Sequence, residues 1–257
     1  MASITWDTIL ASDQFKFIVG RERAEFTVHS AVIASQSAAL EKLVNNGMKE
    51  SQERCVVWDE VDVATFTRFC QFAYTGTYTS TGPRKRPDYV KPEGPQPPPA
   101  VRQLNDLAQR RNPDANRCFQ LWKAFQSLHP SSVKTLSGKN KPDDDFTPFL
   151  SHARLYVLAE CYGIDSLGQM ALRTLRLHLQ ELTLYSETTD ECLELIKYCY
   201  DNTVEGEGKA DALRHLLNLH AACNLEQFWK NPEFRALMRD NEEFSEGVMN
   251  LLMKRLD

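Results

Sequence analysis

The sequence predicts an α+β fold, in which a small β-sheet with its helices precedes a region that is helical throughout. Three observations predict it. Apolar residues alternate in short stretches near the N-terminus, and from residue 147 onward they recur at helical spacing. A proline-rich stretch lies between these two patterns and interrupts the chain.

Three short stretches near the N-terminus have the pattern of strands. Phe15, Phe17 and Val19 occupy alternate positions, which predicts a strand with one buried face. Residues 24–29 follow a polar turn and predict its hairpin partner, and residues 55–58 predict a third strand.

Helical spacing separates these strands. Residues 30–46 predict a pair of short helices that stop at Asn45-Asn46-Gly47. Asp62 stands in the N-cap position of a further helix, which we expect to end at Gly76.

The composition changes sharply between Thr79 and Ala100, where seven prolines occur. Such a segment cannot bury enough surface to offset its ordering entropy, so we expect residues 80–100 to be disordered in the free protein. Apolar spacing returns with an aromatic stripe that can fold back on the domain as a satellite cluster: Phe119, Trp122 and Phe125.

Helical patterns fill the remainder. Thr147-Pro148 places a proline in the first turn of a helix. Thr188 and Glu191 have capping-box spacing at the start of another. Further helices are predicted over residues 165–180, 211–223 and 241–256.

Bulk properties argue against several classes of protein. The net charge of −5 argues against a dedicated nucleic-acid surface, which usually carries a basic excess. The N-terminus lacks the pattern of a signal peptide, and no apolar run approaches the roughly 18–20 residues of a membrane helix. The seven scattered cysteines indicate reduced thiols used as core residues. We therefore expect an intracellular protein of the cytoplasm, the nucleus or both.

Two stretches carry a resemblance to a known family. Phe26-Thr-Val-His-Ser is a strand that enters a helix through His29, and Phe72-Ala-Tyr-Thr-Gly ends a helix at Gly76. In this order they resemble the signature of the BTB (POZ) domain, and Asp13 sits where that family has an acid before its first strand. The later half is similar to BTB proteins of fungal type.

The resemblance implies a small sheet that caps a cluster of helical hairpins. It places a BTB domain over residues 1–183, with the proline-rich insertion at about 79–147, and a helical C-terminal extension over 184–257. Phe26, His29, Tyr74 and Gly76 are then structural, with the His29 ring bonding backbone at the helix start. BTB domains are protein-interaction modules, so the resemblance implies docking and no catalysis.

Met48-Lys49-Glu50 is an apolar residue and an acid separated by one position. In BTB adaptors such a triplet docks on a cullin ubiquitin-ligase scaffold, and a methionine adapts its shape to a groove. The resemblance thus implies a substrate adaptor that binds a cullin through Met48 and Glu50, and both side chains should then be exposed. The alternatives are a BTB self-association or scaffolding protein, for example in transcription, and a purely structural Met48 with Glu50 in solvent.

Ser30 departs from the family pattern. Dimeric relatives carry a base after the histidine, and that base pairs with an acid like Asp13 in a buried charged pocket. Ser30 leaves Asp13 without this partner, and an unpaired buried charge is costly. We therefore expect the swapped dimer of the family to be weak or absent.

No pattern in the sequence predicts an enzyme, a cofactor or a metal site. The spacings of His215, His220 and Cys223 do not place them well on one helical face, so we interpret them as packing side chains. Gly206-Glu-Gly208-Lys209 lacks the preceding strand of a phosphate loop.

Overall fold

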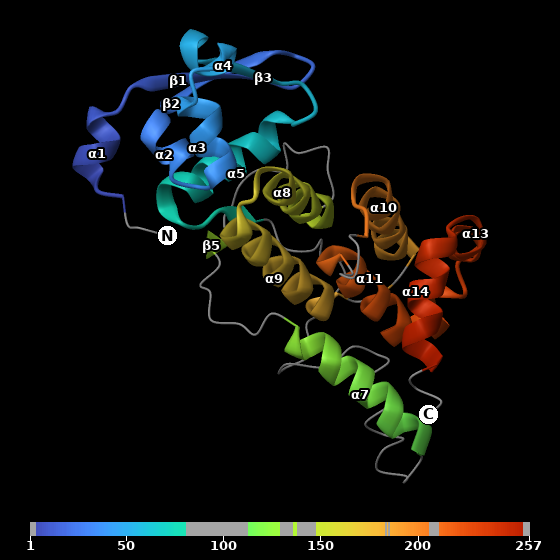
Figure 1. Ribbon diagram of the computed structural model, residues 1–257. Helices are drawn as coiled ribbons and strands as arrows, with labels where there is room; N and C mark the ends of the chain where they lie inside the picture. Colours follow the sequence, from blue (N-terminus) through green and yellow to red (C-terminus); the bar gives the residue numbers. More distant parts are fainter. Residues whose placement is uncertain are drawn as a thin grey trace. The chain divides into compact units, whose positions relative to one another are not determined.

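The computed structural model describes residues 4–80, 113–128, 136–137, 148–182, 184, 186–205 and 211–253. It confirms the α+β fold, with a small sheet followed by a largely helical region (Figure 1). The chain forms two compact units, the first made of Met1–Thr81, Lys134–Asp145 and Arg154–Met170, and the second of Gly82–Val133, Phe146–Ala153 and Ala171–Asp257. None of the described helices combines the length and apolar character needed to cross a membrane.

The first unit is built on a three-stranded sheet of order β2-β1-β3. β1 (Gln14–Val19) pairs antiparallel with β2 (Ala24–His29) and parallel with β3 (Cys55–Trp58). The register places Phe17 opposite both Phe26 and Val56, so β1 forms the centre of the sheet. All three predicted strands are therefore confirmed.

Short helices connect these strands. They are α1 (Trp6–Ala11), α2 (Ser30–Ala34), α3 (Ala38–Asn45) and α4 (Lys49–Glu53), followed by α5 (Val63–Thr75). α3 ends where Gly47 adopts a positive φ of 78°, as the Asn-Asn-Gly stop predicts. α5 begins at the Asp62 cap, whose carboxylate accepts from Thr65 N, and ends at Gly76 in the left-handed region.

Aromatic rings form the core of this unit. The ring centroid of Phe66 lies 5.0 Å from those of Phe17 and Phe26 and 5.8 Å from that of Trp58. Tyr162, at the end of α8 (Pro148–Tyr162), stacks on Trp58 with a 4.5 Å separation. The Asp62 cap also pairs with Arg154 of α8 at 2.9 Å, which ties α8 to the start of α5.

Two short parallel strands flank the insertion and pair with each other. β4 (Thr79–Ser80) pairs with β5 (Leu136–Ser137), so the two ends of the insertion lie side by side in the first unit. Between these strands the structure describes α7 (Pro113–Ser127), which belongs to the second unit. The predicted disorder at residues 80–100 concerns a segment that, apart from Ser80, lies outside the described residues.

The second unit is helical. Its helices are the second half of α9 (Asp165–Glu181), α10 (Ser186–Asn202), α11 (Ala212–Cys223), α12 (Leu225–Phe228), α13 (Pro232–Asp240) and α14 (Glu242–Met253), together with α7 and the start of α8. α11 is central, with nine buried residues out of twelve. α10 begins at Ser186, so the capping-box interpretation of Thr188 is wrong, and Thr188 is a buried residue inside the helix.

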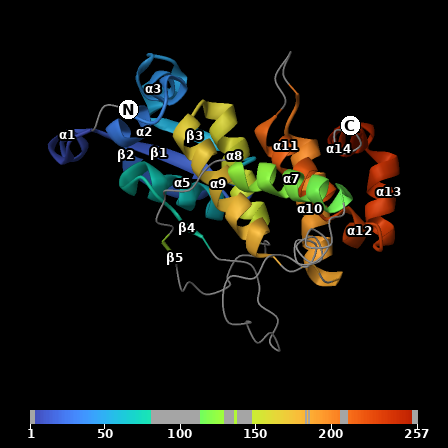
Figure 2. The ribbon, with the colours of Figure 1, turned by 90° about the horizontal axis from the view of Figure 1, so that it is seen from below.

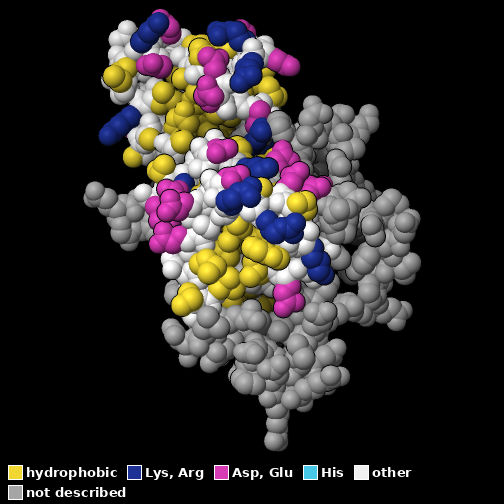
Figure 3. Space-filling model, turned by 90° about the vertical axis from the view of Figure 1, so that its right-hand side faces the viewer, with side chains coloured by type: hydrophobic (Ala, Val, Ile, Leu, Met, Phe, Trp, Pro, Cys, Tyr) yellow, Lys and Arg dark blue, Asp and Glu magenta, His cyan; other side chains and the backbone are white. Residues whose placement is uncertain are grey.

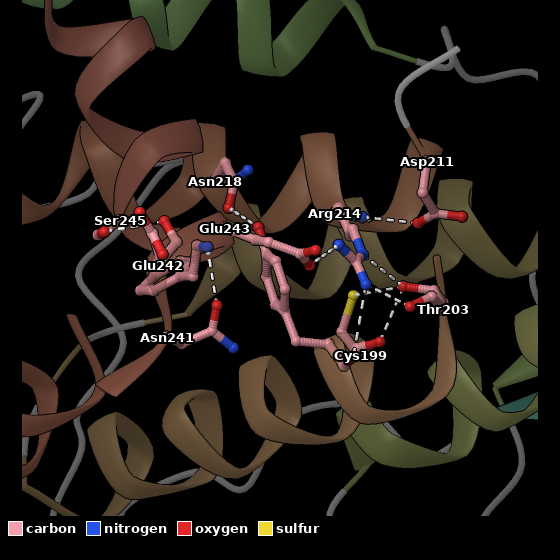
Figure 4. Close-up of polar contacts among 11 residues, drawn as sticks. Cys199, Thr203, Asp211, Arg214, Asn218, Asn241, Glu242, Glu243 and Ser245 are labelled. Carbon is pink, nitrogen blue, oxygen red and sulfur yellow. Dashed lines mark hydrogen bonds and ion pairs between the residues drawn. The ribbon is translucent and has the colours of Figure 1, made fainter. Parts of the chain in front are cut away.

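A buried arginine connects three helices of this unit (Figure 4). Arg214 on α11 is 3% exposed and donates to Thr203 Oγ1 at 2.9 Å, to Glu243 of α14 at 2.5 Å and to the carbonyl oxygens of Tyr200 and Thr203. Its guanidinium carbon lies 4.4 Å from the ring centroid of Tyr200. Because these donors are satisfied, the buried cation stabilises the junction at the end of α10.

Two further buried contacts involve histidines, one polar and one between aromatic rings. His152 Nε2 lies 3.1 Å from His178 Nδ1, and burial lowers the pKa of His178 to about 4. His220 packs between the rings of Phe125 and Phe228, and burial lowers its pKa to about 4 as well. Both histidines are therefore neutral near pH 7. His220 is the packing side chain that its spacing predicts.

The boundary expected near residue 183 remains a prediction. The compact units divide inside α9, at residue 170, and assign α7 of the insertion to the helical unit. Because α9 continues through residue 170, helical spacing in the sequence does not reveal where one unit ends and the other begins.

Candidate functional site

The Met48 triplet follows the end of α3 and forms an exposed corner of the first unit. Gly47 reverses the chain with its positive φ, and Asn46 Oδ1 accepts from Met48 N at 2.8 Å. Met48 is the N-cap residue of α4 in extended conformation, and its side chain is 63% exposed. Met48 is therefore one of the large apolar side chains that the described part of the chain leaves exposed.

The backbone of this corner is held by local hydrogen bonds. Ser51 Oγ and Gln52 N both donate to the carbonyl oxygen of Met48, at 2.8 and 3.0 Å. The Gln52 side chain donates to the Gly47 carbonyl at 2.6 Å. These hydrogen bonds fix the backbone on both sides of the exposed Met48 side chain.

Glu50 lies in the first turn of α4 and is half-buried, although an exposed site is expected for it. Its position two residues after Met48 places it near the positive end of the helix, where a carboxylate is favourable.

A cleft of about 300 Å³ adjoins this corner. Polar side chains form its rim: Asp13, Ser30, Asn45, Ser51, Gln52 and Arg54. Phe15 and Val44 supply the floor. The corner and the cleft are thus built by the ends of α3, α4 and β1.

The expectation that Asp13 lacks a basic partner is wrong. Asp13 Oδ2 lies 2.8 Å from a guanidinium nitrogen of Arg54, the left-handed C-cap of α4. Both side chains are more than half exposed, so this pair contributes at most about 1 kcal/mol. The basic partner of Asp13 is thus Arg54, 24 residues after the position where the family carries its base. Ser30 donates its backbone N–H to the Asp13 carbonyl at 2.8 Å.

His29 makes a contact other than the one the resemblance implies. Its ring makes no cap bond at the start of α2, and Nδ1 instead lies 2.8 Å from the hydroxyl of Tyr74. The same hydroxyl accepts from His29 N at 3.0 Å. His29 and Tyr74 therefore join the β2–α2 junction to the end of α5, and Gly76 closes that helix with a bond from its N to Phe72 O at 2.7 Å.

The sequence interpretation missed α1. Thr5 caps this helix by accepting from Thr8 N, and Ile9 is buried while Trp6 and Leu10 are 64% and 69% exposed. Trp6 and Leu10 are four residues apart and so share one face. Their spacing was a signal for this helix, but six residues are too few for periodicity to be read with certainty.

The described residues contain no group of three or more His, Cys, Asp or Glu side chains that could hold a metal ion. The six cysteines whose side chains are described form no disulfide, and Cys118 lies outside that set. Burial raises the pKa of Cys70 and of Cys199 to about 12, so both are protonated thiols at neutral pH. This environment suits packing rather than nucleophilic chemistry.

The BTB/POZ domain model matches residues 5–90 of the chain, which contain the sheet, α1 to α5, the Met48 corner and the His29–Tyr74 contact. No curated protein matches the sequence. The match and the observed sheet with its helices agree. The N-terminal part of this protein is a BTB/POZ domain, a module for protein–protein interaction.

Proposed function

We propose that the protein is a substrate adaptor for a cullin-type ubiquitin ligase, with the Met48 corner as its docking point. The observation that carries this proposal is the exposed side chain of Met48 on a hydrogen-bonded backbone. Methionine fills irregular pockets with little strain, and Glu50 adds direction through its charge.

The surface of the described residues is mixed in charge. On the face drawn in Figure 3, Lys and Arg side chains are mixed with Asp and Glu side chains around hydrophobic areas. A mixed distribution favours a complementary protein surface over a uniformly charged polymer. The substrate would be recruited by the insertion or by the helices after residue 183.

Replacing Met48 tests the proposal. Truncation of an anchor costs on the order of 2 kcal/mol of binding free energy, so Met48→Ala should weaken cullin binding roughly thirtyfold. Titration calorimetry with the N-terminal domain of the host's BTB-binding cullin measures this change. Glu50→Ala should weaken binding by a smaller factor.

The control is Met249→Ala, which removes an equally long side chain that is 51% exposed on α14. It should leave cullin affinity unchanged, and none of the three variants should lower the melting temperature appreciably. If the unmutated protein shows no binding at tens of micromolar, the adaptor proposal is wrong.

A second candidate function is self-association or scaffolding without a ligase role. The observation that favours it is the exposed face of α1 formed by Trp6 and Leu10. Arg54 pairs with Asp13, so the missing base at position 30 no longer argues against a dimer. Sedimentation of the intact chain and of a Trp6→Ala, Leu10→Ala variant distinguishes the two functions. A dimer that dissociates in the variant, together with no cullin binding, supports scaffolding.

The finer family assignment belongs to the same proposal. Two observations support a BTB protein of fungal type with a C-terminal helical extension: the helical second unit, and the resemblance of residues 149–164 and 193–203 to helices of such proteins. A location in the cytoplasm or nucleus accords with the described cysteines, none of which forms a disulfide.

A further inference from the structure

Two arginines on α9 share one face of the helix. Arg173 and Arg176 are three positions apart and Gln180 follows four positions later, so the three side chains lie on adjacent turns of that face. A different face of α9 packs on the start of α8, where His178 contacts His152 (Figures 1 and 2). Because residues two positions apart do not share a helix face, the arginines lie on a face other than that of His178.

Arg176 is a buried cation that has no counter-ion among the described residues. Its side chain is 3% exposed, and the neighbouring Arg173 is half-buried. The Nε atoms of both side chains are buried and have no hydrogen-bond acceptor in the described part of the chain. Neither guanidinium pairs with a described Asp or Glu side chain, and Arg176 donates to the neutral amide oxygen of Gln180 at 2.9 Å.

Arg214 shows how a buried arginine is otherwise satisfied in this unit. It is as buried as Arg176, yet its guanidinium pairs with the carboxylate of Glu243. Burial of an unpaired charge is unfavourable, and a like charge one turn away adds repulsion. Burial and then the Arg173 charge lower the pKa of Arg176 from its ordinary value, in agreement with both effects. Because a guanidinium stays protonated in proteins, an anion is the partner that relieves this charge.

We propose that Arg173 and Arg176 form a binding site for a phosphate group carried by a side chain of a partner protein. A phosphorylated side chain carries about two negative charges at pH 7, which match two guanidinium groups, whereas a carboxylate carries one. Arginines donate paired N–H groups to phosphate oxygens, and arginine clusters are a recurrent means of recognising phosphorylated peptides.

A protein is the favoured source of the phosphate because the chain contains a BTB/POZ domain, a module for protein–protein interaction. Arg173 is the more exposed of the two arginines, so we expect the phosphate to approach from its side. Both arginines belong to the second unit, and the site does not depend on Met48 or on the proposed cullin contact.

Nuclear magnetic resonance of the intact chain tests the site, because each arginine Nε–H gives a signal that responds to a bound anion. The probe is N-acetyl-phosphoserine amide. It should shift the signals of Arg173 and Arg176 with a dissociation constant on the order of 1 mM, as expected of a small ligand held by charge-assisted hydrogen bonds. N-acetylserine amide and acetate should bind more weakly by about tenfold or more.

Single substitutions identify the two side chains. Arg173→Gln and Arg176→Gln should each weaken binding of the phosphoserine probe by about tenfold or more, since each removes one of the two guanidinium groups. The control is Arg239→Gln, which removes an equal charge from an exposed side chain of the same unit. It should leave the affinity unchanged, because the site depends on two particular arginines and not on the net charge.

Stability without the probe separates a binding role from a structural one. Arg176→Gln removes an unpaired charge and keeps a polar side chain, so it should leave the urea midpoint of the second unit unchanged or raise it. Arg214→Ala should lower the same midpoint, because Arg214 has its carboxylate partner. Hydrogen exchange of α11 during denaturation reports on this unit.

Four results overturn the proposal. One is no saturable shift of either Nε–H signal at about 100 mM probe, a hundred times the expected dissociation constant. Another is an equal shift with acetate, which makes this face a general anion contact. A third is an Arg176→Gln variant as unstable as Arg214→Ala, which makes Arg176 structural. The last is tighter binding of inorganic phosphate than of the phosphoserine probe, which assigns the site to the free ion.

Discussion

The two units bury different kinds of side chain. In the described residues of the first unit, the core is a set of aromatic rings around Phe66, and the buried polar groups are Gln36, Thr65 and Ser80. The described core of the second unit contains Arg214, His152 and His220 among its apolar residues. The comparison indicates that apolar packing stabilises the interaction module, whereas the helical unit also depends on buried polar groups in one protonation state.

The largest expected effect tests the aromatic core. Phe66→Ala removes a fully buried ring that packs against four others and should destabilise the first unit by about 4 kcal/mol. Urea denaturation with hydrogen exchange of α5 measures it. Val57→Thr, at an exposed position of β3, should stay within about 0.5 kcal/mol. Equal effects of the two changes would contradict this description of the core.

Arg214→Ala tests the polar core. The change leaves the carbonyl oxygens of Tyr200 and Thr203 without their donor and removes the contact with the Tyr200 ring, so we expect a loss of about 3 kcal/mol in the second unit. The control is Arg239→Ala, whose side chain is exposed and pairs with the adjacent Asp240. It should cost less than about 0.5 kcal/mol by the same denaturation measurement.

Acid should weaken the second unit selectively. His178 and His220 stay neutral in the fold down to a pKa of about 4, while the unfolded chain binds protons below pH 6.5. The unfolded state therefore binds more protons in this window, and stability falls as the pH drops from 6.5 to 4.

The expected loss at pH 5 is on the order of 2 kcal/mol per histidine. Hydrogen exchange at pH 7 and pH 5, corrected for intrinsic rates, should show loss of protection in α11 before α5. His178→Gln should remove about half of the difference, since glutamine does not titrate. If acid lowered the hydrogen-exchange protection of α5 as much as that of α11, the two units would not differ in their response to pH, and the prediction would be wrong.

The smallest effect concerns the His29–Tyr74 contact. Tyr74→Phe removes the hydroxyl that accepts from His29 N and contacts the imidazole, and should cost about 1 kcal/mol in the first unit. Thermal unfolding of the variant checks it. A matched change is Tyr198→Phe on α10, which should leave α5 as protected as before because it lies in the other unit.

The local elements were largely predictable, because their signals lie within a few residues. Alternation at Phe15, Phe17 and Val19 identified β1, and the Asp62 cap and Gly76 identified both ends of α5. The exposure expected of Met48 is confirmed, whereas Glu50, expected to be exposed as well, is half-buried. Where the signal was ambiguous the prediction failed, as for Thr188, which has capping-box neighbours but lies inside α10.

What the sequence determined by itself is therefore the three strands of the sheet, the longer helices that follow them, the BTB signature and the Met48 triplet, since each depends on neighbouring residues. Only the tertiary structure decided that Arg54 pairs with Asp13, that Tyr74 bonds His29 and that α7 packs on α11. Each of these contacts joins residues 41 to nearly 100 positions apart. Packing of distant segments selects such partners, and no local spacing encodes them.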